Sequence, residues 1–424
     1  MTKLYTCQPS RFQTGSWEGF VLGFRLTEVG DTGERMQGTW YNPEYREYRD
    51  KLSGRRIVQL TDYFTHSNHL YFTNETFYQG DIIFKSQRGN ASNLFRLKMD
   101  SMQIVQLTDL PQPSYHDRYF DRLLLSYVHE GNDEVYMFYL GQVLALNLKT
   151  LQQRVLYDTT EGYYLSSGSP SADGKYIVVS INENKVHREF EGGFYETWAA
   201  YPETRLIRIE IETGRTDTVY VEPYWIKHVN MSPTVPHLLT FCHEGPWDKI
   251  DHRVWLLDLT TGKTAKLVPD QGPMKSVGHE YWFTDGVRLG YHGRKVQPDG
   301  QIHGYFGSIR YDNTEQTEVD FPFTSHHFHS NDLELIVGDG QRITNPHVLL
   351  WKRNGYGFDQ PRVLAYHGGM AINAATHVHP RFTADASQVL YTSDRGGYAN
   401  LYLAEVGDVE DLPLLAEVQA SKQA

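Results

Sequence analysis

The chain has 424 residues and a formal net charge of −12, and it is rich in tyrosine (29), phenylalanine (20) and glycine (36). An acidic surface repels phosphate backbones, so we expect no nucleic-acid partner, and no run of 18 apolar residues predicts a membrane span. The only cysteines are Cys7 and Cys242, which is too few for a disulfide framework, and the first residues lack the apolar core of a signal peptide, so we expect a reduced, cytoplasmic protein.

Residues 1–45 have no clear periodicity, and we assign them to an N-terminal extension. Between residues 46 and 406 one pattern repeats: an apolar strand, a polar turn, an alternating strand, a second turn and a short last strand. The alternating strands recur roughly every 40 to 60 residues, which is the spacing of β-propeller blades. They lie at 93–97, 143–148, 205–211, 253–259, 307–311, 347–351 and 400–404.

The last repeat has no fourth strand after residue 404. A strand of the same character stands instead near the start of the chain, at residues 52–61, and it resembles the fourth strand of the first repeat at 102–108. An N-terminal strand that completed the last blade would close the ring and leave no exposed edge. We therefore predict an all-β fold, a seven-bladed β-propeller closed by an N-terminal strand, with a polar tail at 407–424. Two stacked β-sandwiches would explain the strands but not the early one.

Histidines open three successive repeats. His377 and His379 are two residues apart on a segment expected to be extended, so their side chains should project the same way and could share a divalent cation. His279 opens the fifth repeat and His327 opens the sixth, while Arg253 belongs to the fourth. Each histidine alone would more often be structural. Since propeller loops bring neighbouring blades together at one end of the axis, we expect these residues to form one site.

Several uncommon strings in the chain resemble, in the same order, those of the oligogalacturonate lyases, a family of seven-bladed propeller enzymes that degrade short pectin fragments. The resemblance extends from about residue 48 to residue 405. It is densest at Thr65-His66-Ser67-Asn68, Cys242-His243-Glu244-Gly245-Pro246, His279-Glu280-Tyr281-Trp282, Val337-Gly338-Asp339-Gly340 and Thr376-His377-Val378-His379-Pro380.

The resemblance implies roles for individual residues. Matched motif by motif, the family's catalytic base falls on His279 and its catalytic arginine on Arg253. Its metal ligands fall on His327, His377 and His379. A site of histidine and oxygen ligands suits a first-row divalent ion better than Ca²⁺, and we expect Mn²⁺.

Some positions depart from the family pattern or leave a choice open. The family's glutamine three residues before the histidine pair is replaced by Ala374, and neighbouring Asn373, or a water, is the candidate substitute ligand. His326 is a candidate substitute for His327, because the spacing to the following motif differs by one residue. The candidates for substrate binding are His243, His66 and Asn68, for each of which a structural role is the alternative.

The expected function is a metal-assisted lyase that cleaves short uronate oligosaccharides, first of all oligogalacturonides, by β-elimination. A cation that neutralises the uronate carboxylate favours loss of the neighbouring C5 proton, a neutral histidine can accept that proton, and an arginine can hold the carboxylate. Two alternatives stay open. One is the same mechanism on a uronate derived from ulvan or rhamnogalacturonan, and the other is a non-catalytic binding platform like the TolB propellers. The oligomeric state is not predicted.

Overall fold

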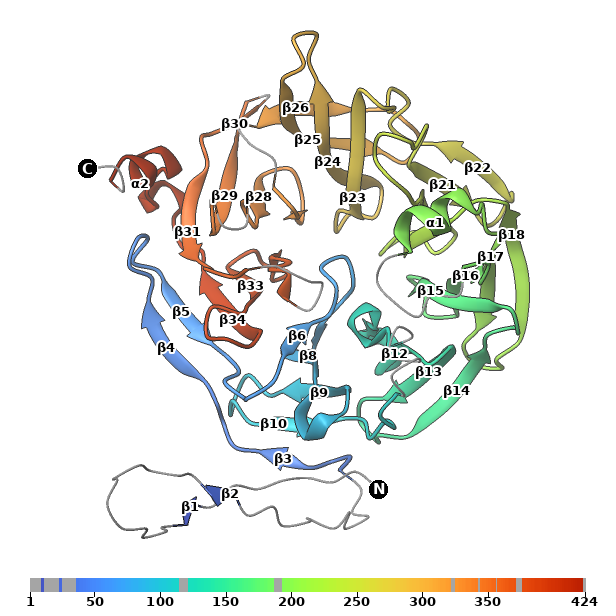
Figure 1. Ribbon diagram of the computed structural model, residues 1–424, viewed down its shortest axis with the longest axis horizontal. Helices are drawn as coiled ribbons and strands as arrows, with labels where there is room; N and C mark the ends of the chain where they lie inside the picture. Colours follow the sequence, from blue (N-terminus) through green and yellow to red (C-terminus); the bar gives the residue numbers. More distant parts are fainter. Residues whose placement is uncertain are drawn as a thin grey trace, which may run out of the picture.

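Seven antiparallel sheets surround a central axis in the computed structural model (Figure 1). The structure describes residues 9–10, 23–24, 36–113, 121–186, 193–321, 325–341, 344–355, 357–370 and 376–421. Within these ranges no helix is both long and apolar enough to cross a membrane. The arrangement confirms the predicted all-β, seven-bladed propeller.

Blades one to six take their strands in chain order from the axis outwards, whereas blade seven takes its outer strand from the start of the chain. Blades one to three contain β6 (Ser67–His69), β8 (Asp81–Ser86), β9 (Asn93–Leu97) and β10 (Ile104–Gln106); β11 (Tyr127–His129), β12 (Glu134–Tyr139), β13 (Gln142–Asn147) and β14 (Gln153–Asp158); and β15 (Tyr163–Pro170), β16 (Tyr176–Glu183), β17 (Thr204–Glu210) and β18 (Thr216–Glu222). Blades four and five contain β19 (Ile226–Met231), β20 (Leu238–His243), β21 (Val254–Asp258) and β22 (Lys263–Lys266); and β23 (Lys275–Trp282), β24 (Arg288–Val296), β25 (Ile302–Arg310) and β26 (Thr317–Phe321).

Blades six and seven lie beside the start of the ring. They contain β27 (Phe328–His329), β28 (Leu335–Gly338), β29 (His347–Asn354) and β31 (Arg362–Tyr366); and β32 (Arg381–Phe382), β33 (Gln388–Ser393), β34 (Asn400–Glu405) and β5 (Arg56–Gln59). The smaller elements are β1 (Pro9–Ser10), β2 (Gly23–Phe24), β3 (Trp40–Tyr41), β4 (Arg46–Arg49), β7 (Phe77–Tyr78), β30 (Gly357–Phe358), α1 (Phe194–Ala199), α2 (Leu415–Ser421) and 3-10 turns at Arg88–Asn90, Leu123–Leu125, Glu130–Asn132 and Val409–Asp411.

Every alternating strand predicted from the sequence is the third strand of its blade. Such a strand packs against both neighbouring blades, because successive side chains point to opposite faces of a sheet. In β9, Leu94 lies in a core shared with blade two, whereas Phe95 and Leu97 lie in a core shared with blade seven. The alternation in the sequence therefore reflects two apolar faces rather than one apolar and one solvated face.

Pairing between β5 and β34 closes the ring, as predicted. Ile57 lies opposite Ala404, and Val58 lies opposite Leu403. In Figure 1 the early strands β4 and β5 run beside the last blade. The segment we assigned to the N-terminal extension also contributes to the sheets, since β3 pairs with β10 on the outer edge of blade one.

The C-terminal segment differs from the expected polar tail. Residues 409–411 form a 3-10 turn and residues 415–421 form α2, which lies against the outer side of blade six (Figure 1). Leu412, Leu415 and Val418 are buried. Leu415 and Val418 are three residues apart on α2 and therefore lie on one helical face, whereas Leu412 lies in extended backbone before the helix. This buried apolar face explains why the segment packs against the protein.

The closure can be tested at Ile57, which is fully buried between β34 and the neighbouring blade. Ile57→Ala is expected to lower the free energy of unfolding by about 2–5 kcal/mol, because the deleted methyl groups leave a cavity at the seam of the ring. Arg56→Ala is the matched control on the same strand. Its exposed ion pair with Glu47 is expected to contribute less than about 1 kcal/mol. Urea unfolding measures both, and equal effects would contradict a closing role for the buried face of β5.

Candidate active site

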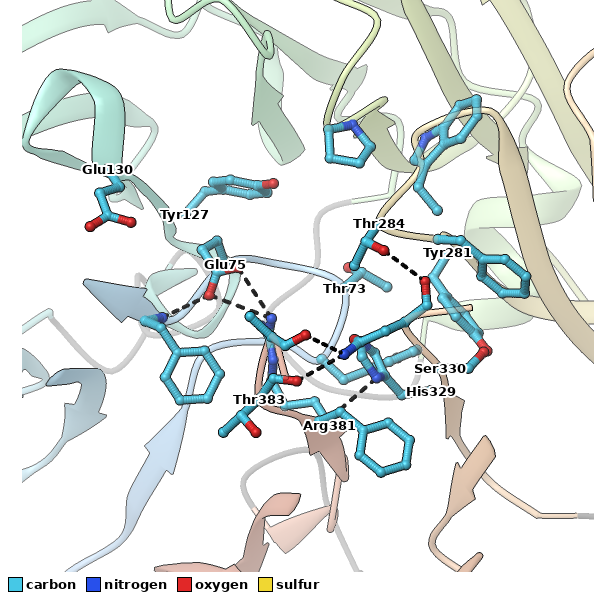
Figure 2. A pocket seen from close by; sticks show the side chains of 18 of the residues that line it. Thr73, Glu75, Tyr127, Glu130, Tyr281, Thr284, His329, Ser330, Arg381 and Thr383 are labelled. Carbon is cyan, nitrogen blue, oxygen red and sulfur yellow. Dashed lines mark hydrogen bonds and ion pairs between the residues drawn. The ribbon is translucent and has the colours of Figure 1, made fainter. Parts of the chain in front are cut away.

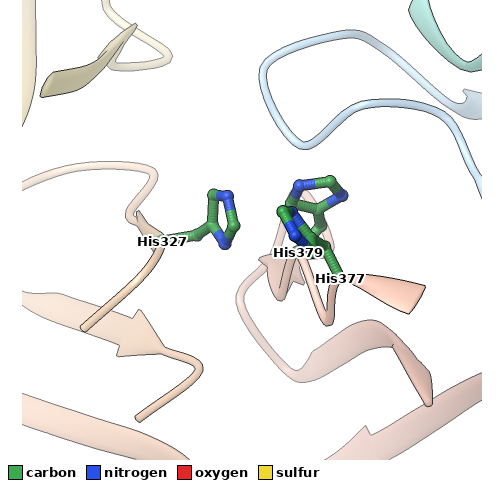
Figure 3. Close-up of side chains that lie close together, drawn as sticks. All are labelled: His327, His377 and His379. Atoms are coloured by element: carbon green, nitrogen blue, oxygen red, sulfur yellow. The ribbon is translucent and has the colours of Figure 1, made fainter. Parts of the chain in front are cut away.

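Three imidazoles from two neighbouring blades come together at the axis. Nitrogen atoms of His327, His377 and His379 all lie within 4.8 Å of one another. Figure 3 shows His327 facing the other two across a narrow gap. His379 has a left-handed backbone, with φ of 45°, so the segment is not the regular strand expected from the sequence. Even so, the pair converges, with ring centroids 5.3 Å apart.

Asp339 holds His327 in a fixed orientation. Its carboxylate accepts a bond from the His327 backbone N–H at 2.9 Å and contacts the ring Nδ1 at 2.7 Å. A carboxylate on one ring nitrogen fixes the tautomer and directs the other nitrogen away from it, which is the usual outer arrangement around a metal-binding histidine. The Val337-Gly338-Asp339-Gly340 string is therefore part of the site.

His379 provides a second indication that the cluster can hold a cation. Its Nε2 is buried and has no hydrogen-bond partner among the described residues. Burial, followed by the neighbouring histidines, holds the pKa of His379 well below its usual value, so the ring is neutral at physiological pH. Neutral imidazoles with an unpaired nitrogen are ligands for Mn²⁺, Zn²⁺ and related ions, so the residues present fit a divalent metal.

His279 lies beside this cluster on β23. Its ring centroid is 4.6 Å from that of His327, and its Nδ1 is 3.0 Å from Nε2 of His292. Burial lowers the pKa of His279 well below its ordinary value, and the charges of His327, His292 and Arg253 lower it further. The imidazole of His279 is therefore neutral at pH 7 and able to accept a proton, as the sequence analysis requires of a base.

A β-bulge places His279 and its neighbour in the site. On β23, Gly278 pairs with His292 and Tyr281 pairs with Gly290, so His279 and Glu280 together oppose one residue of β24. His279 has φ of 50°, a left-handed conformation that costs energy in a side-chain-bearing residue. Bulges re-aim side chains, which explains how two consecutive residues both contact groups in the site.

Arg253 lies between two buried carboxylates. Its Nη1 donates to Glu244 Oε1 at 3.0 Å, and its Nε lies 3.7 Å from Glu280 Oε2. Burial alone raises the pKa of Glu244, but Arg253, Lys227 and His228 outweigh it and hold that pKa well below the usual range. Both oxygens of Glu280 lack a hydrogen-bond partner within the described part of the chain. The buried carboxylates of Glu244 and Glu280 therefore orient the Arg253 guanidinium.

His228 is a site residue that the sequence reasoning missed. It lies in a bulge of β19 with φ of 51°, two residues before Asn230, which resumes pairing with β20. His279 and His379 likewise stand two residues before the position where regular pairing begins. The sequence feature that could have identified His228 is its position one blade repeat before His279. The short string Lys227-His228-Val229 does not reveal that position unless the strand register is known.

Two cavities are lined by residues of the inner strands or their neighbours. One of about 360 Å³ is bordered by His279, His292 and His326. The other has a volume of about 430 Å³ and is lined by Tyr281, His329 and Arg381 (Figure 2). These three residues follow His279, His327 and His379 by two positions each. Phe72 lies between the second cavity and the histidines, since it lines that cavity and its ring contacts His279, His327 and His379 at centroid distances of 6.3, 5.4 and 5.7 Å.

The remaining predicted residues take different positions. His326 borders the first cavity, with its ring 6.1 Å from that of His377. His243 stacks on Tyr224 at 3.8 Å and has its Nε2 2.9 Å from Glu222, and none of its recorded contacts is with the histidine cluster.

Two further candidates lie at the start of blade one. His66 accepts a bond from the Ala399 N–H at 3.1 Å, and Asn68 is buried on β6, where it pairs with Lys85. Asn373 and Ala374 lie outside the described residues.

Comparison with known proteins gives one consistent result. The family model described as oligogalacturonate lyase matches residues 36–410. The chain is 27% identical over 394 residues to an oligogalacturonate lyase of Dickeya dadantii, covering 86% of this chain and 96% of that protein. It is also 27% identical over 391 residues to an oligogalacturonide lyase of Pectobacterium atrosepticum, with the same coverage of 86% and 96%.

Solved structures show the same fold. An oligogalacturonate lyase in complex with manganese superposes with a TM-score of 0.78 at 24% identity, covering 89% of this chain and 98% of that one. An oligogalacturonate lyase from Vibrio parahaemolyticus gives a TM-score of 0.78 at 23% identity, covering 88% and 99%.

The buried charges around Arg253 lead to a stability prediction. Arg253→Met is expected to lower the free energy of unfolding by about 3–5 kcal/mol, because Glu244 and Glu280 would remain buried without the guanidinium. Arg353→Met is the control, since Arg353 forms an exposed ion pair with Glu334 and should contribute less than about 1 kcal/mol. Urea unfolding of both variants checks this, and equal stability of the two would show that Arg253 does not balance the carboxylates.

Proposed function

This chain belongs to the oligogalacturonate lyase family, and on that premise we propose that it cleaves short galacturonate oligosaccharides by β-elimination. The observation that carries the proposal is the juxtaposition of the three-histidine cluster, the neutral imidazole of His279 and the guanidinium of Arg253. Family membership favours a lyase over a non-catalytic binding platform. The products would be a 4,5-unsaturated uronate and a shortened saccharide.

His327, His377 and His379 would hold a divalent metal, and Mn²⁺ is our first choice. The three converging imidazoles, the Asp339 carboxylate behind His327 and the manganese bound by a relative of the same fold support this. When bound, the cation would neutralise the uronate carboxylate and so make the neighbouring C5 proton more acidic. Asn373 or a water would supply a fourth ligand, and His326 is the proposed substitute for His327.

His279 would accept the C5 proton. Its depressed pKa keeps the ring unprotonated at physiological pH, and its contact with His292 fixes the ring plane. The low pKa also limits its strength as a base, so the carbon acid must be activated by charge on the carboxylate before the proton can move. This division of work explains why the base and the proposed ligands lie side by side.

Arg253 would bind a uronate carboxylate through Nη2. That nitrogen has no recorded partner among the described residues, whereas Nη1 is held by Glu244. A planar guanidinium with one edge fixed presents its other edge in a defined direction, which a lysine would not do. His243, His66 and Asn68 remain proposed substrate contacts, and a uronate of another polysaccharide remains the second candidate substrate.

The proposed function is tested with galacturonate di- and trisaccharides and added Mn²⁺, by following the ultraviolet absorbance of the conjugated double bond. We expect product formation that EDTA abolishes and Mn²⁺ restores. His377→Ala should lower bound manganese at least tenfold, measured by elemental analysis after gel filtration. His303→Ala is the control, because His303 is an exposed residue of β25. Full activity in EDTA would contradict the proposed metal dependence. Absence of product from all uronates tested would contradict the proposed lyase activity.

A second experiment distinguishes the proposed role of His279 as a base from that of a metal ligand. His279→Ala should retain manganese but lower kcat by about 10²–10⁴, which is the usual contribution of a positioned proton acceptor. His377→Ala, which should lose the metal, is the comparison. If His279→Ala instead loses manganese in parallel with activity, His279 is a ligand and another residue takes the proton.

A further inference from the structure

His228 belongs to blade four and contacts Glu244 and Tyr71 beside the proposed site. Its side chain is 25% exposed, in contrast to the buried Glu244 beside it. It occupies the bulged, left-handed position on β19 that His279 occupies on β23. Strained backbone of this kind persists only where the surrounding sheet enforces it, and it gathers at functional sites.

The contacts of His228 connect it to both parts of the proposed site. Its Nε2 lies 3.5 Å from Glu244 Oε2, and the other oxygen of Glu244 accepts from Arg253 at 3.0 Å. The ring of Tyr71 contacts both His228 and the cluster, with centroid distances of 5.9 Å to His228 and 4.9 Å to His379. His228 therefore borders the space between the proposed carboxylate anchor and the proposed metal ligands.

β-Elimination benefits from a proton donor as well as from a base. As the C4–O bond breaks, the departing saccharide oxygen becomes negatively charged, and a proton donor lowers that barrier. We propose that His228 is the general acid that protonates the leaving oxygen, an inference that rests on the proposed β-elimination. Glu244 would hold Nε2–H, and Nδ1–H, which has no recorded partner among the described residues, would be the donor.

The step balances in atoms and charge. His279 takes the C5 proton, and the electron pair of that C–H bond becomes the second bond between C4 and C5. The pair of the C4–O bond stays on the departing oxygen, which receives the Nδ1 proton of His228. His279 then loses one proton to solvent and His228 gains one, so no other reactant is needed.

Other groups near the site fit this role less well. Burial raises the pKa of Tyr71 far above its usual value, which makes its phenol too weak an acid. Burial lowers the pKa of His292 and of His69 to about 4, so neither carries a second proton at neutral pH. The ammonium of Lys227 is already engaged, since its Nζ pairs with Glu244 Oε2 at 3.6 Å.

The same residues do not favour a second metal site. His228, Cys242 and Glu244 offer ligand atoms within 4.8 Å of one another. However, Arg253 and Lys227 already neutralise Glu244, with Arg253 Nη1 at 3.0 Å and Lys227 Nζ at 3.6 Å. Burial also raises the pKa of the Cys242 thiol, which disfavours the thiolate that a metal would require.

A leaving-group experiment on the manganese-loaded enzyme tests the proposal. Galacturonate trisaccharide requires a proton on its leaving oxygen, whereas a galacturonate carrying a 4-nitrophenoxy group at C4 releases a stable phenolate. His228→Asn suits the left-handed backbone, since asparagine tolerates this conformation. We expect kcat/KM to fall about 10²–10⁴-fold on the trisaccharide and less than about tenfold on the nitrophenyl substrate. His303→Asn on the exposed surface is the matched control.

His228→Gly is the second variant, because glycine also accepts a positive φ. Added imidazole should restore its activity on the trisaccharide alone. Equal losses on both substrates, activity unchanged on both, or the same selective loss in His326→Asn in place of His228→Asn would overturn the assignment. If the wild-type enzyme forms no unsaturated product from either substrate, the proposed lyase activity fails, and that result is distinct from a failure confined to the His228 variants.

Discussion

Closure of the ring is the constraint on which the rest of the structure depends. The hydrogen bonds between β5 and β34 join a strand near the start of the chain to the last strand of the propeller. The candidate site is built from four successive blades, so its distances are determined by how the blades pack around the axis. A ring with an unpaired seam would let blades six and seven separate, and the approach of His327 to His377 and His379 depends on that packing.

Within the closed ring, local irregularity determines which atoms meet. His228, His279 and His379 all have positive φ, a conformation that costs roughly 1 kcal/mol or more for residues other than glycine. Regular pairing of the inner strands resumes two residues later and holds this conformation in place. The bulges also bring Glu280 next to Arg253, so the same irregularity supplies both the imidazoles and the buried charges around them.

The sequence predicted the parts of the molecule that repeat. The seven alternating strands and the early closing strand are detectable because side-chain period and blade spacing are local properties of the chain. The roles proposed for His279 and His327 come from the family resemblance of motifs with several distinctive residues. His228 escaped notice because the bulge that aims it depends on pairing with β20, which has no signature in a single strand. Phe72 was missed for a similar reason, since its contacts join blade one to histidines of blades five, six and seven, which lie far along the chain.

The seam also determines the order in which the protein can be completed during synthesis. Ile57 and Val58 leave the ribosome almost an entire chain length before their partners Ala404 and Leu403. Until then β5 lacks its neighbour β34, and an unpaired apolar edge of this kind is an aggregation hazard that chaperones must cover. His377 and His379 emerge just before β34, so nascent chains acquire the complete histidine cluster only in the last stage of translation. Chains that terminate early would therefore lack the closing seam, and those that end before residue 377 would also lack two of the three clustered imidazoles.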